Sequence, residues 1–240
     1  MPGTVKPYQA EGSKREQVEQ MFDRISPKYD LLNRMLSMGT DQGWRRKVVR
    51  MLGREPVEHL LDVATGTADL AIMARNKAKH ITGADISAGM LARGQAKVNK
   101  AGLAHKITLV QADAAQLPFP DHAFDAITIA FGVRNFEDLE KGMRGMVRVL
   151  RPGGRLFVLE FSRPRATPFK QLFRFYFHHI MPLIGRLLSK DKAAYTYLPE
   201  SVDAFPQGKE FEAIMARCGL NGVRSRPLTF GVATLYTARK

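Results

Sequence analysis

Apolar residues in the first 58 positions of the chain recur at helical spacing. Ser13 and Glu16 stand at the positions of a capping box, which predicts a helix start. Apolar residues then return every three or four positions, at Val18, Met21, Phe22 and Ile25. Ser26-Pro27 predicts a second helix, with the serine as N-cap and the proline in the first position. With a third, basic amphipathic helix over residues 44–53, the pattern predicts a helical lead-in over residues 1–58.

The pattern changes at residue 59, where short apolar runs rich in β-branched residues replace the helical spacing. The apolar runs cover residues 59–64, 80–86, 107–113, 124–132 and 154–161. Stretches of helical character separate them. Continuous apolar strands between helices are typical of a parallel sheet covered on both faces, and right-handed crossovers make it doubly wound. We therefore predict an α/β fold with a Rossmann-like core over residues 59–164.

Residues 165–206 interrupt this alternation and predict a helical insertion before the last strands. One helical face carries its apolar residues, which are Phe169, Leu172, Phe173, Tyr176, Phe177 and Ile180. Pro182 is expected to break or kink this helix before it continues over residues 184–188. A closing segment over residues 207–240 combines a helix over 207–218 with a terminal hairpin. Without repeats or low-complexity segments, the chain 1–240 is predicted to be a single domain.

Charge and cysteine content narrow the class of protein. The chain carries 37 Lys and Arg against 23 Asp and Glu, and this net charge of +14 favours a polyanionic partner, either nucleic acid or an anionic membrane surface. Cys218 is the single cysteine, so an internal disulfide and a cysteine-rich zinc site are both excluded. Its apolar-periodic helix predicts a buried thiol. The polar N-terminus and the absence of a long apolar run predict a cytoplasmic protein.

The first predicted strand leads into a turn of small residues. Residues 60–71 form a strand, this turn and the start of a helix, which is the usual point of nucleotide contact in a doubly wound fold. Gly66 lets the backbone come close to a ligand because it has no Cβ, and Thr67 offers a hydroxyl and an N–H. The chain has neither the dinucleotide-binding motif GxGxxG nor the phosphate loop GxxxxGK[ST] at this turn, so no pyrophosphate-binding site is predicted there.

Acids follow the next two strands. Asp85 ends a strand about twenty residues after the turn, where an acid accepts hydrogen bonds from both ribose hydroxyls of an adenosine. The alternative role for Asp85 is a helix cap, although Ser87 is a plausible cap itself. Asp113 is placed to take an adenine amino group, and the small Ala114 leaves room for the ring. Asp113 also suits an ordinary turn.

Together these blocks resemble class I methyltransferases, which bind S-adenosylmethionine on a Rossmann-like sheet. Three further stretches, over residues 21–46, 124–138 and 195–206, are similar to the ubiquinone/menaquinone biosynthesis C-methyltransferase family. The likeness extends from about residue 18 to the end of the chain, and the long N-terminal block and the FGVRN segment are specific to that family.

The resemblance implies a cofactor and a substrate. S-adenosylmethionine would contact Thr67, Asp85, Asp113 and Ala114, and the acceptor would be a prenylated quinol. Two residues depart from the family pattern. Ala68 replaces a usual glycine and would crowd the cofactor if its backbone has positive φ. Ala130 stands where many relatives have serine, which removes one possible hydrogen bond to the cofactor.

Methylation at carbon requires the reduced quinol, because a quinone is itself electrophilic. Arg134 and Asn135 follow the fourth strand, at the sheet edge where such folds place substrates. Arg134 would stabilise the developing phenolate or position a water that takes the proton, and Asn135 would hold the second quinol oxygen. The alternative for Arg134 is a surface ion pair with Glu137 or Asp138.

Two more features concern the quinol. Tyr29 lies in the N-terminal block, which resembles an active-site lid, and would contact the quinol or else pack in the core beside Leu32. Residues 169–188 would form an apolar mouth that admits the isoprenoid tail from a bilayer, in peripheral contact with an anionic membrane surface. Its cations are Lys170, Arg174, Arg186 and Lys190. The alternative is a helix packed over the sheet.

Acceptors other than a quinol fit the sequence less well. A nucleic-acid methyltransferase would suit the charge, but the segment after the fourth strand lacks the Asn/Asp-Pro-Pro-aromatic motif of base-amino methylation. A small-molecule O- or N-methyltransferase would share the same fold, and so would a non-enzymatic binding module. Within the family, demethylmenaquinol is favoured over the benzoquinol of ubiquinone synthesis, and nucleic acid is not expected as a partner. The oligomeric state stays open.

Overall fold

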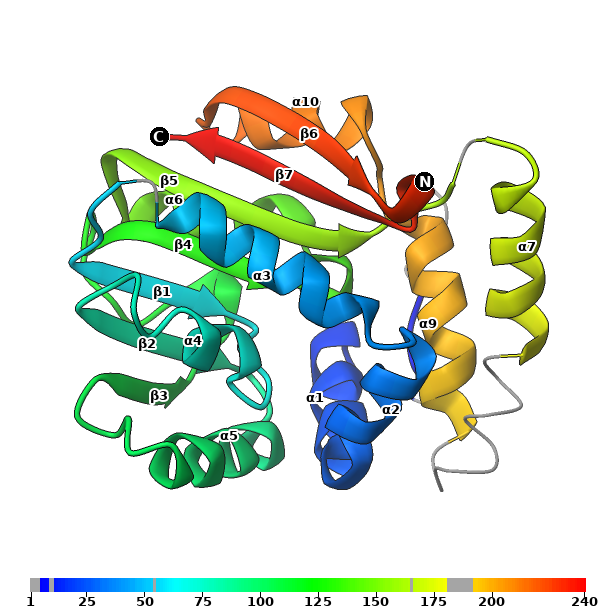
Figure 1. Ribbon diagram of the computed structural model, residues 1–240, viewed down its shortest axis with the longest axis horizontal. Helices are drawn as coiled ribbons and strands as arrows, with labels where there is room; N and C mark the ends of the chain where they lie inside the picture. Colours follow the sequence, from blue (N-terminus) through cyan, green and yellow to red (C-terminus); the bar gives the residue numbers. More distant parts are fainter. Residues whose placement is uncertain (1–4, 9–10, 54, 165, 181–191) are drawn as a thin grey trace.

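A seven-stranded sheet forms the centre of the computed structural model, which describes residues 5–8, 11–53, 55–164, 166–180 and 192–240 (Figure 1). The strand order is β3-β2-β1-β4-β5-β7-β6. The strands span His59–Val63 (β1), His80–Asp85 (β2), Ile107–Gln111 (β3), Phe124–Ala130 (β4), Leu150–Phe161 (β5), Asn221–Leu228 (β6) and Ala233–Arg239 (β7). Each of the predicted apolar runs is therefore a strand.

The sheet is parallel from β1 to β5 and antiparallel at one edge. β1 pairs in parallel with β2 and β4, whereas β7 runs antiparallel to both β5 and β6. The predicted doubly wound parallel sheet is thus confirmed for five strands, and the predicted terminal hairpin adds the other two. Leu60 and Leu61 point to opposite faces and are both fully buried, which explains why the strand has a continuous apolar sequence. Strand order reverses between β1 and β4, so a crevice opens at their carboxyl ends.

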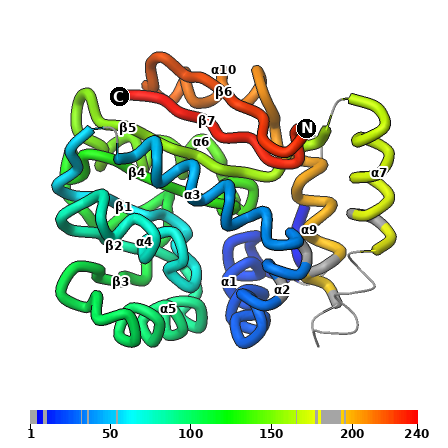
Figure 2. The backbone as a smooth tube through the Cα atoms, viewed as in Figure 1, coloured from blue at the N-terminus to red at the C-terminus, as the bar shows by residue number. Residues whose placement is uncertain are grey.

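Helices cover both faces of the sheet (Figure 2). The helices α3 (Thr40–Leu52), α4 (Asp69–Met73) and α5 (Ala88–Lys100) share one apolar core with the sheet, and α6 (Leu139–Val149) and α10 (Lys209–Arg217) share the other. Cys218 is buried in the second core, as predicted. Each helix supplies one apolar stripe, because the opposite side faces water.

The N-terminal helices lie beside the carboxyl ends of the strands (Figure 1). They are α1 (Lys14–Ile25), the short 3₁₀ helix η1 (Ser26–Lys28) and α2 (Tyr29–Leu36). The predicted capping box of α1 is present in full. The prediction of Ser26 as an N-cap was wrong: its hydroxyl donates to the Asp23 carbonyl at 3.0 Å, and Ile25 precedes η1 instead. The third helix begins at Thr40, four residues before the predicted start at Trp44.

The insertion stands outside the sheet, next to the N-terminal helices. It contains α7 (Phe169–Phe175), a π-helical turn η4 (Tyr176–Ile180) and α9 (Lys192–Ala204). The predicted kink at Pro182 and the segment 184–188 lie outside the described residues. Among the described residues, three further short helices are η2 (Ala114–Gln116), η3 (Val133–Asn135) and η5 (Thr229–Gly231).

The apolar face predicted for the insertion is only partly covered. Phe173 and Tyr176 pack towards Val202 of α9, whereas Leu172 and Phe175 are 64% and 56% exposed. Helix α7 therefore packs against α9 and not over the sheet (Figure 1). Leu172 and Phe175 thus form an exposed apolar surface on this helix.

Candidate functional site

A cavity of about 480 Å³ opens at the carboxyl ends of β1, β2 and β4, beneath α1 and α2. Its volume lies in the usual range for small-molecule sites. Six of the predicted site residues line it: Tyr29, Gly66, Asp85, Asp113, Ala114 and Asn135. The N-terminal helices add three more, Arg15, Val18 and Phe22. The structure therefore brings most of the predicted site residues together, and it places the N-terminal block over them.

The turn after β1 forms the wall of the cavity. Gly66 has φ +57°, and a Cβ built on it would meet only a ring carbon of Tyr29, at 3.9 Å. The backbone is therefore open to a ligand at this position. Ala68 also has a positive φ, of 63°, so the departure from the family's glycine falls where a side chain is strained. Its methyl group packs towards Gly94 of α5, however, and does not line the cavity.

Asp85 is a buried acid that faces the cavity from the end of β2. Its Oδ2 accepts the Gly66 N–H at 2.8 Å, and its Oδ1 accepts the Ser87 N–H at 2.9 Å. Burial raises the pKa of Asp85 to about 6, against the hydrogen bonds, and nearby Asp23 raises the pKa further. Ser87 caps α5 through the Met90 N–H, so the capping role is not left to Asp85.

Asp113 meets a partner that the sequence pattern did not indicate. Its Oδ1 accepts the Ala115 N–H at 2.8 Å, and its Oδ2 lies 2.8 Å from Nε of Arg15 on α1. Ala114 beside it is buried against the cavity. A basic side chain of the N-terminal helix thus reaches the acid expected at the adenine end. The only sequence signal for Arg15 is its position within the first turn of the capped helix.

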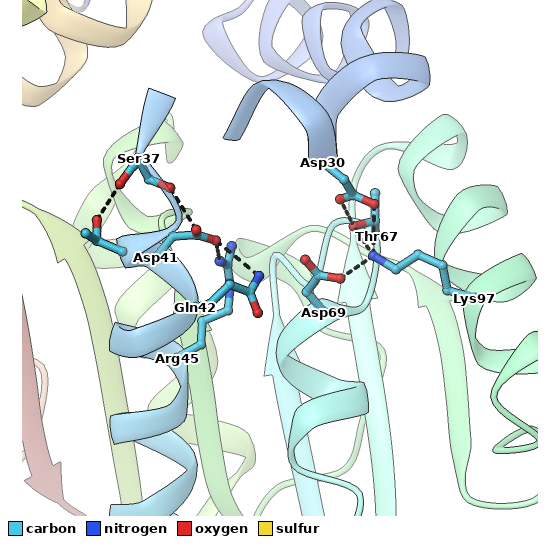
Figure 3. Close-up of polar contacts among 9 residues, drawn as sticks. Asp30, Ser37, Asp41, Gln42, Arg45, Thr67, Asp69 and Lys97 are labelled. Atoms are coloured by element: carbon cyan, nitrogen blue, oxygen red, sulfur yellow. Dashed lines mark hydrogen bonds and ion pairs between the residues drawn. The ribbon is translucent and has the colours of Figure 1, made fainter. Parts of the chain in front are cut away.

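Thr67 belongs to a cluster that ties α2 to the core (Figure 3). Its hydroxyl donates to Asp30 Oδ1 at 2.6 Å, and the Lys97 ammonium donates to Thr67 and to Asp30, each at 3.0 Å. Lys97 also pairs with Asp69. The Thr67 side chain does not line the large cavity, so a cofactor contact by its backbone N–H stays a prediction. Asp30 lies in the family-specific block but was not singled out there.

Arg134 is held in the interior behind Asn135. Its guanidinium donates to Glu160 Oε1 at 2.8 Å and to the Phe131 carbonyl at 2.5 Å, and it lies over the Phe161 ring. The alternative of a surface pair with Glu137 or Asp138 is therefore not seen. Arg134 does not line the large cavity, whereas Asn135 does. Its role towards a substrate stays a prediction.

Asn135 and Tyr29 present polar groups to the cavity. The Tyr197 hydroxyl on α9 donates to Asn135 Oδ1 at 3.1 Å, which holds the side-chain amide in one orientation. Tyr29 opens α2, and its ring contacts Phe22 edge-on with centroids 6.0 Å apart. Burial raises the pKa of Tyr29, so its hydroxyl stays protonated and able to donate a hydrogen bond. Tyr197 was not singled out, although it lies in the family-specific stretch 195–206.

The N-terminal helix α1 is pinned to the core at two further points. Lys14 donates from Nζ to the carbonyls of Arg134 and Phe136, each at 3.0 Å, and its pKa is lowered to about 8, chiefly by burial. Asp23 Oδ1 accepts from the Ser87 hydroxyl at 2.6 Å and from the Gly89 N–H at 2.9 Å. These contacts hold the helix over the cavity.

The sheet order and the position of the cavity define the class I methyltransferase fold. A methyltransferase from Aquifex aeolicus, described as dependent on S-adenosylmethionine, has a similar structure with a TM-score of 0.57. That likeness covers 81% of this chain and 88% of the other, at 20% sequence identity. At this identity the comparison shows the fold.

Sequence comparison is more specific. The model of the ubiE/COQ5 methyltransferase family matches residues 10–240, and the chain belongs to that family. A demethylmenaquinone methyltransferase from Bacteroides fragilis is 50% identical over 98% of this chain and 97% of its own length. A ubiquinone/menaquinone biosynthesis C-methyltransferase from Geotalea daltonii is 47% identical over 95% of this chain and 97% of its own length. The protein is accordingly an S-adenosylmethionine-dependent methyltransferase.

The residues present fit this cofactor. Gly66 leaves open space in the cavity wall, into which a Cβ would project. The buried carboxylate of Asp85 accepts hydrogen bonds, and ribose hydroxyls donate them. The cofactor carries no phosphate, in keeping with a turn that lacks a phosphate loop. Among the described residues, no three potential metal ligands gather into a site.

Proposed function

We propose that the protein methylates a ring carbon of a reduced, prenylated naphthoquinol, converting demethylmenaquinol to menaquinol. The observation that carries this proposal is one cavity that joins Asp85 and Asp113, suited to adenosine, to Asn135 and Tyr29, suited to two phenolic oxygens. The similarity to demethylmenaquinone methyltransferases over nearly the whole chain supports the same acceptor.

The cofactor supplies an electrophilic methyl group when it is bound. The protein has to favour the phenolate, align the ring carbon and keep water out. Asn135 would bind one quinol oxygen through its amide, which Tyr197 orients, and Tyr29 would donate to the other. Helix α1 supplies apolar side chains, Val18 and Phe22, which would exclude water from the reacting atoms.

The proton balance of the reaction assigns a part to Arg134. One phenolic proton would leave, and the ortho carbon would accept the methyl group as its bond to sulfur breaks and S-adenosylhomocysteine departs. The ring would then lose the proton at that carbon while the oxygen regains one, so that one proton is released overall. We propose that the Arg134 guanidinium stabilises the phenolate from behind Asn135, as a fixed positive charge or through a water. Its pairing with Glu160 keeps it in place without reorganisation during the reaction.

Methyl-transfer assays test the acceptor. The purified protein would receive labelled S-adenosylmethionine and, separately, a reduced short-chain demethylnaphthoquinol, a benzoquinol intermediate analogue and an RNA pool. We expect transfer to the naphthoquinol at the highest rate, and a loss of about 100-fold in an Asn135→Ala variant. Transfer only to the benzoquinol would assign the protein to ubiquinone synthesis instead of menaquinone synthesis. Transfer to RNA alone would overturn the quinol assignment.

We further propose that the protein works at the cytoplasmic face of the membrane, in peripheral contact with anionic lipid. Phe169 stacks on Phe230 with ring centroids 3.9 Å apart, and Leu172 and Phe175 are exposed beside them. Exposed cations accompany this apolar surface, at Lys170 and Arg174 on α7. No helix in the described part of the chain has the length and apolarity of a membrane span. Arg186 and Lys190 lie outside the described residues.

Liposome flotation tests this contact. We expect binding to vesicles with anionic lipid at low salt, little binding to neutral vesicles, and weakening as salt rises. A Leu172→Ser/Phe230→Ser variant should lose most of the binding, because both side chains are exposed and stabilise the fold little. Binding that is absent with anionic vesicles, or unchanged in the variant, would contradict the proposal.

A further inference from the structure

The surface that α3 shares with β6 carries four cations. Lys47 and Arg50 lie about one turn apart on α3, and Arg224 and Arg226 lie on β6, an edge strand of the sheet. The three arginines are exposed and Lys47 is half-buried. Among the described residues, no acid forms an ion pair with any of the four. None of them has a part in the function proposed above, and we call them the α3–β6 cationic surface.

Strand alternation places both arginines of β6 on the face of the sheet that α3 covers. Leu228, at the end of β6, is buried in the apolar core that α3 forms with the sheet. Pairing with β7 is regular from Arg224 to Leu228, and successive side chains of a strand point to opposite faces. Arg224 and Arg226 therefore point to the same face as Leu228. Ser225, between them, bonds to α10 on the other face.

Helix α3 is held beside the end of β6, so the charges of the two elements act on one another. The Trp44 ring N–H donates to the Thr229 hydroxyl at 2.8 Å, one residue beyond the strand. Loss of hydration lowers the pKa of Lys47, and the positive charges of Arg226 and Arg50 lower it further. Like charges that no acid neutralises repel one another, so a bound anion would be favourable at this surface.

Exposed apolar side chains border the α3–β6 cationic surface. Phe230 lies two residues beyond β6, is 67% exposed, and stacks on Phe169 of α7. Figure 1 shows β6 ending on the side of the molecule where α7 stands. Cations beside exposed apolar side chains suit the surface of a bilayer, where phosphate groups adjoin acyl chains. RNA offers phosphates but no apolar phase for the exposed Leu172 of α7, so the combination favours a membrane.

We propose that the α3–β6 cationic surface binds the phosphate groups of anionic phospholipids, so that the sheet core and α7 contact the same membrane. This inference rests on the membrane contact proposed above for α7, and it adds a binding site on a different part of the fold. Guanidinium groups suit phosphate because they donate two parallel hydrogen bonds to it. Each charge at an anionic bilayer raises the affinity about fivefold. Two separate contacts would fix the orientation of the sheet core on the membrane, which one helix alone would not.

Vesicle binding by two variants of equal net charge tests the site. Lys47→Gln/Arg226→Gln removes two charges of the α3–β6 cationic surface. The matched control, Arg93→Gln/Lys100→Gln, removes two exposed charges from α5, which packs beside the opposite edge strand β3. On vesicles of phosphatidylcholine and phosphatidylglycerol at low salt, we expect the first variant to bind at least about tenfold more weakly than the wild type, and the control within about threefold. Both variants should keep the wild-type affinity for S-adenosylhomocysteine, which shows that they are folded.

The outcomes separate this site from the membrane contact on which it rests. Equal weakening in the two variants would overturn the site, because only the net charge of the protein would then matter. Wild-type binding by Lys47→Gln/Arg226→Gln would also overturn it and would leave the contact through α7 in place. No vesicle binding by the wild type would refute the membrane contact itself. RNA binding that this variant loses, with vesicle binding unchanged, would assign the surface to nucleic acid.

Discussion

Arg134 Nη1 and Glu160 Oε1 lie 2.8 Å apart in the interior, with side chains that are 8% and 0% exposed. The carboxylate also accepts the N–H groups of Arg134 and Phe161, so both ends of the pair are anchored to the backbone at the ends of β4 and β5. A charge buried to this extent is stable only while its partner is present. The pair therefore supports the substrate side of the cavity as well as the proposed chemistry.

Removal of the acid should destabilise the protein markedly. We expect Glu160→Gln to lower the free energy of unfolding by about 3 kcal/mol, because it leaves the buried Arg134 charge without its counter-ion. Urea denaturation measures this change. Glu58→Gln is the control, since Glu58 pairs with Lys79 at the surface, and it should cost less than about 1 kcal/mol. Equal costs for the two variants would contradict the structural role of the buried pair.

The Asp30 cluster should govern how often α2 separates from the core. Asp30→Asn removes the charge that faces Lys97, while Lys97 keeps its pairing with Asp69. We expect the amides of α2 to exchange with deuterium about fivefold faster, in line with about 1 kcal/mol of lost interaction, and those of β1 to be unaffected. Asp121→Asn removes an exposed partner of Arg148 and serves as the control. Unchanged exchange in α2 would show that the cluster does not hold this helix on the core.

The pH dependence of stability should report on Asp85. Its pKa is about 6 in the folded protein against an ordinary value of 3.8, so folding favours the protonated form. The resulting stabilisation is complete below pH 4 and is lost as pH rises through 6. Asp85→Asn has no such loss, so its unfolding free energy should fall less than that of the wild type between pH 4 and 7. Thermal or urea unfolding at several pH values measures this, and parallel profiles would contradict the raised pKa.

Adenosine binding should show the opposite dependence on pH at the same residue. An ionised Asp85 is the better acceptor for ribose hydroxyls, so affinity for 5′-methylthioadenosine should fall by up to about tenfold from pH 7.5 to 5. This ligand has no amino acid, so neither an α-carboxylate nor an ammonium group contributes to the measurement. Asp85→Asn should bind weakly at every pH. A variant profile that still falls with pH would assign the titration to another group.

Tyr197 should affect catalysis through Asn135. Tyr197→Phe removes the hydroxyl that holds the Asn135 amide, and we expect kcat to fall about fivefold while cofactor affinity is unchanged. Thr196→Val alters an exposed neighbour whose hydroxyl bonds only within the helix, so it should leave kcat unchanged. If Asn135→Ala and Tyr197→Phe act independently, their combined effect would be the product of the two. A smaller combined effect is expected, because the hydroxyl acts through the amide.

Local patterns were sufficient to predict the five parallel strands and the residues that line the cavity at their carboxyl ends. The apolar runs define five parallel strands, and carboxyl ends of such strands meet at one edge, so Gly66, Asp85 and Asp113 had to lie close together. Hydrophobic burial and backbone pairing depend on residue spacing, which a sequence displays directly. Ser26 shows where local chemistry misled, because its hydroxyl bonds backwards to Asp23 and the backbone continues as a 3₁₀ turn.

Pairings between charged and polar side chains came from the packing of distant elements. Thr67 was expected at the cofactor, yet its hydroxyl donates to Asp30, 37 positions earlier in the chain. Arg134 had acids three and four positions away, yet it pairs with Glu160 across neighbouring strands. A long flexible side chain such as that of arginine can reach several acids, and its ion pairs with them would be of similar strength in water. The relative desolvation of those partners then determines which pair forms, and burial at each site exists only in the folded chain.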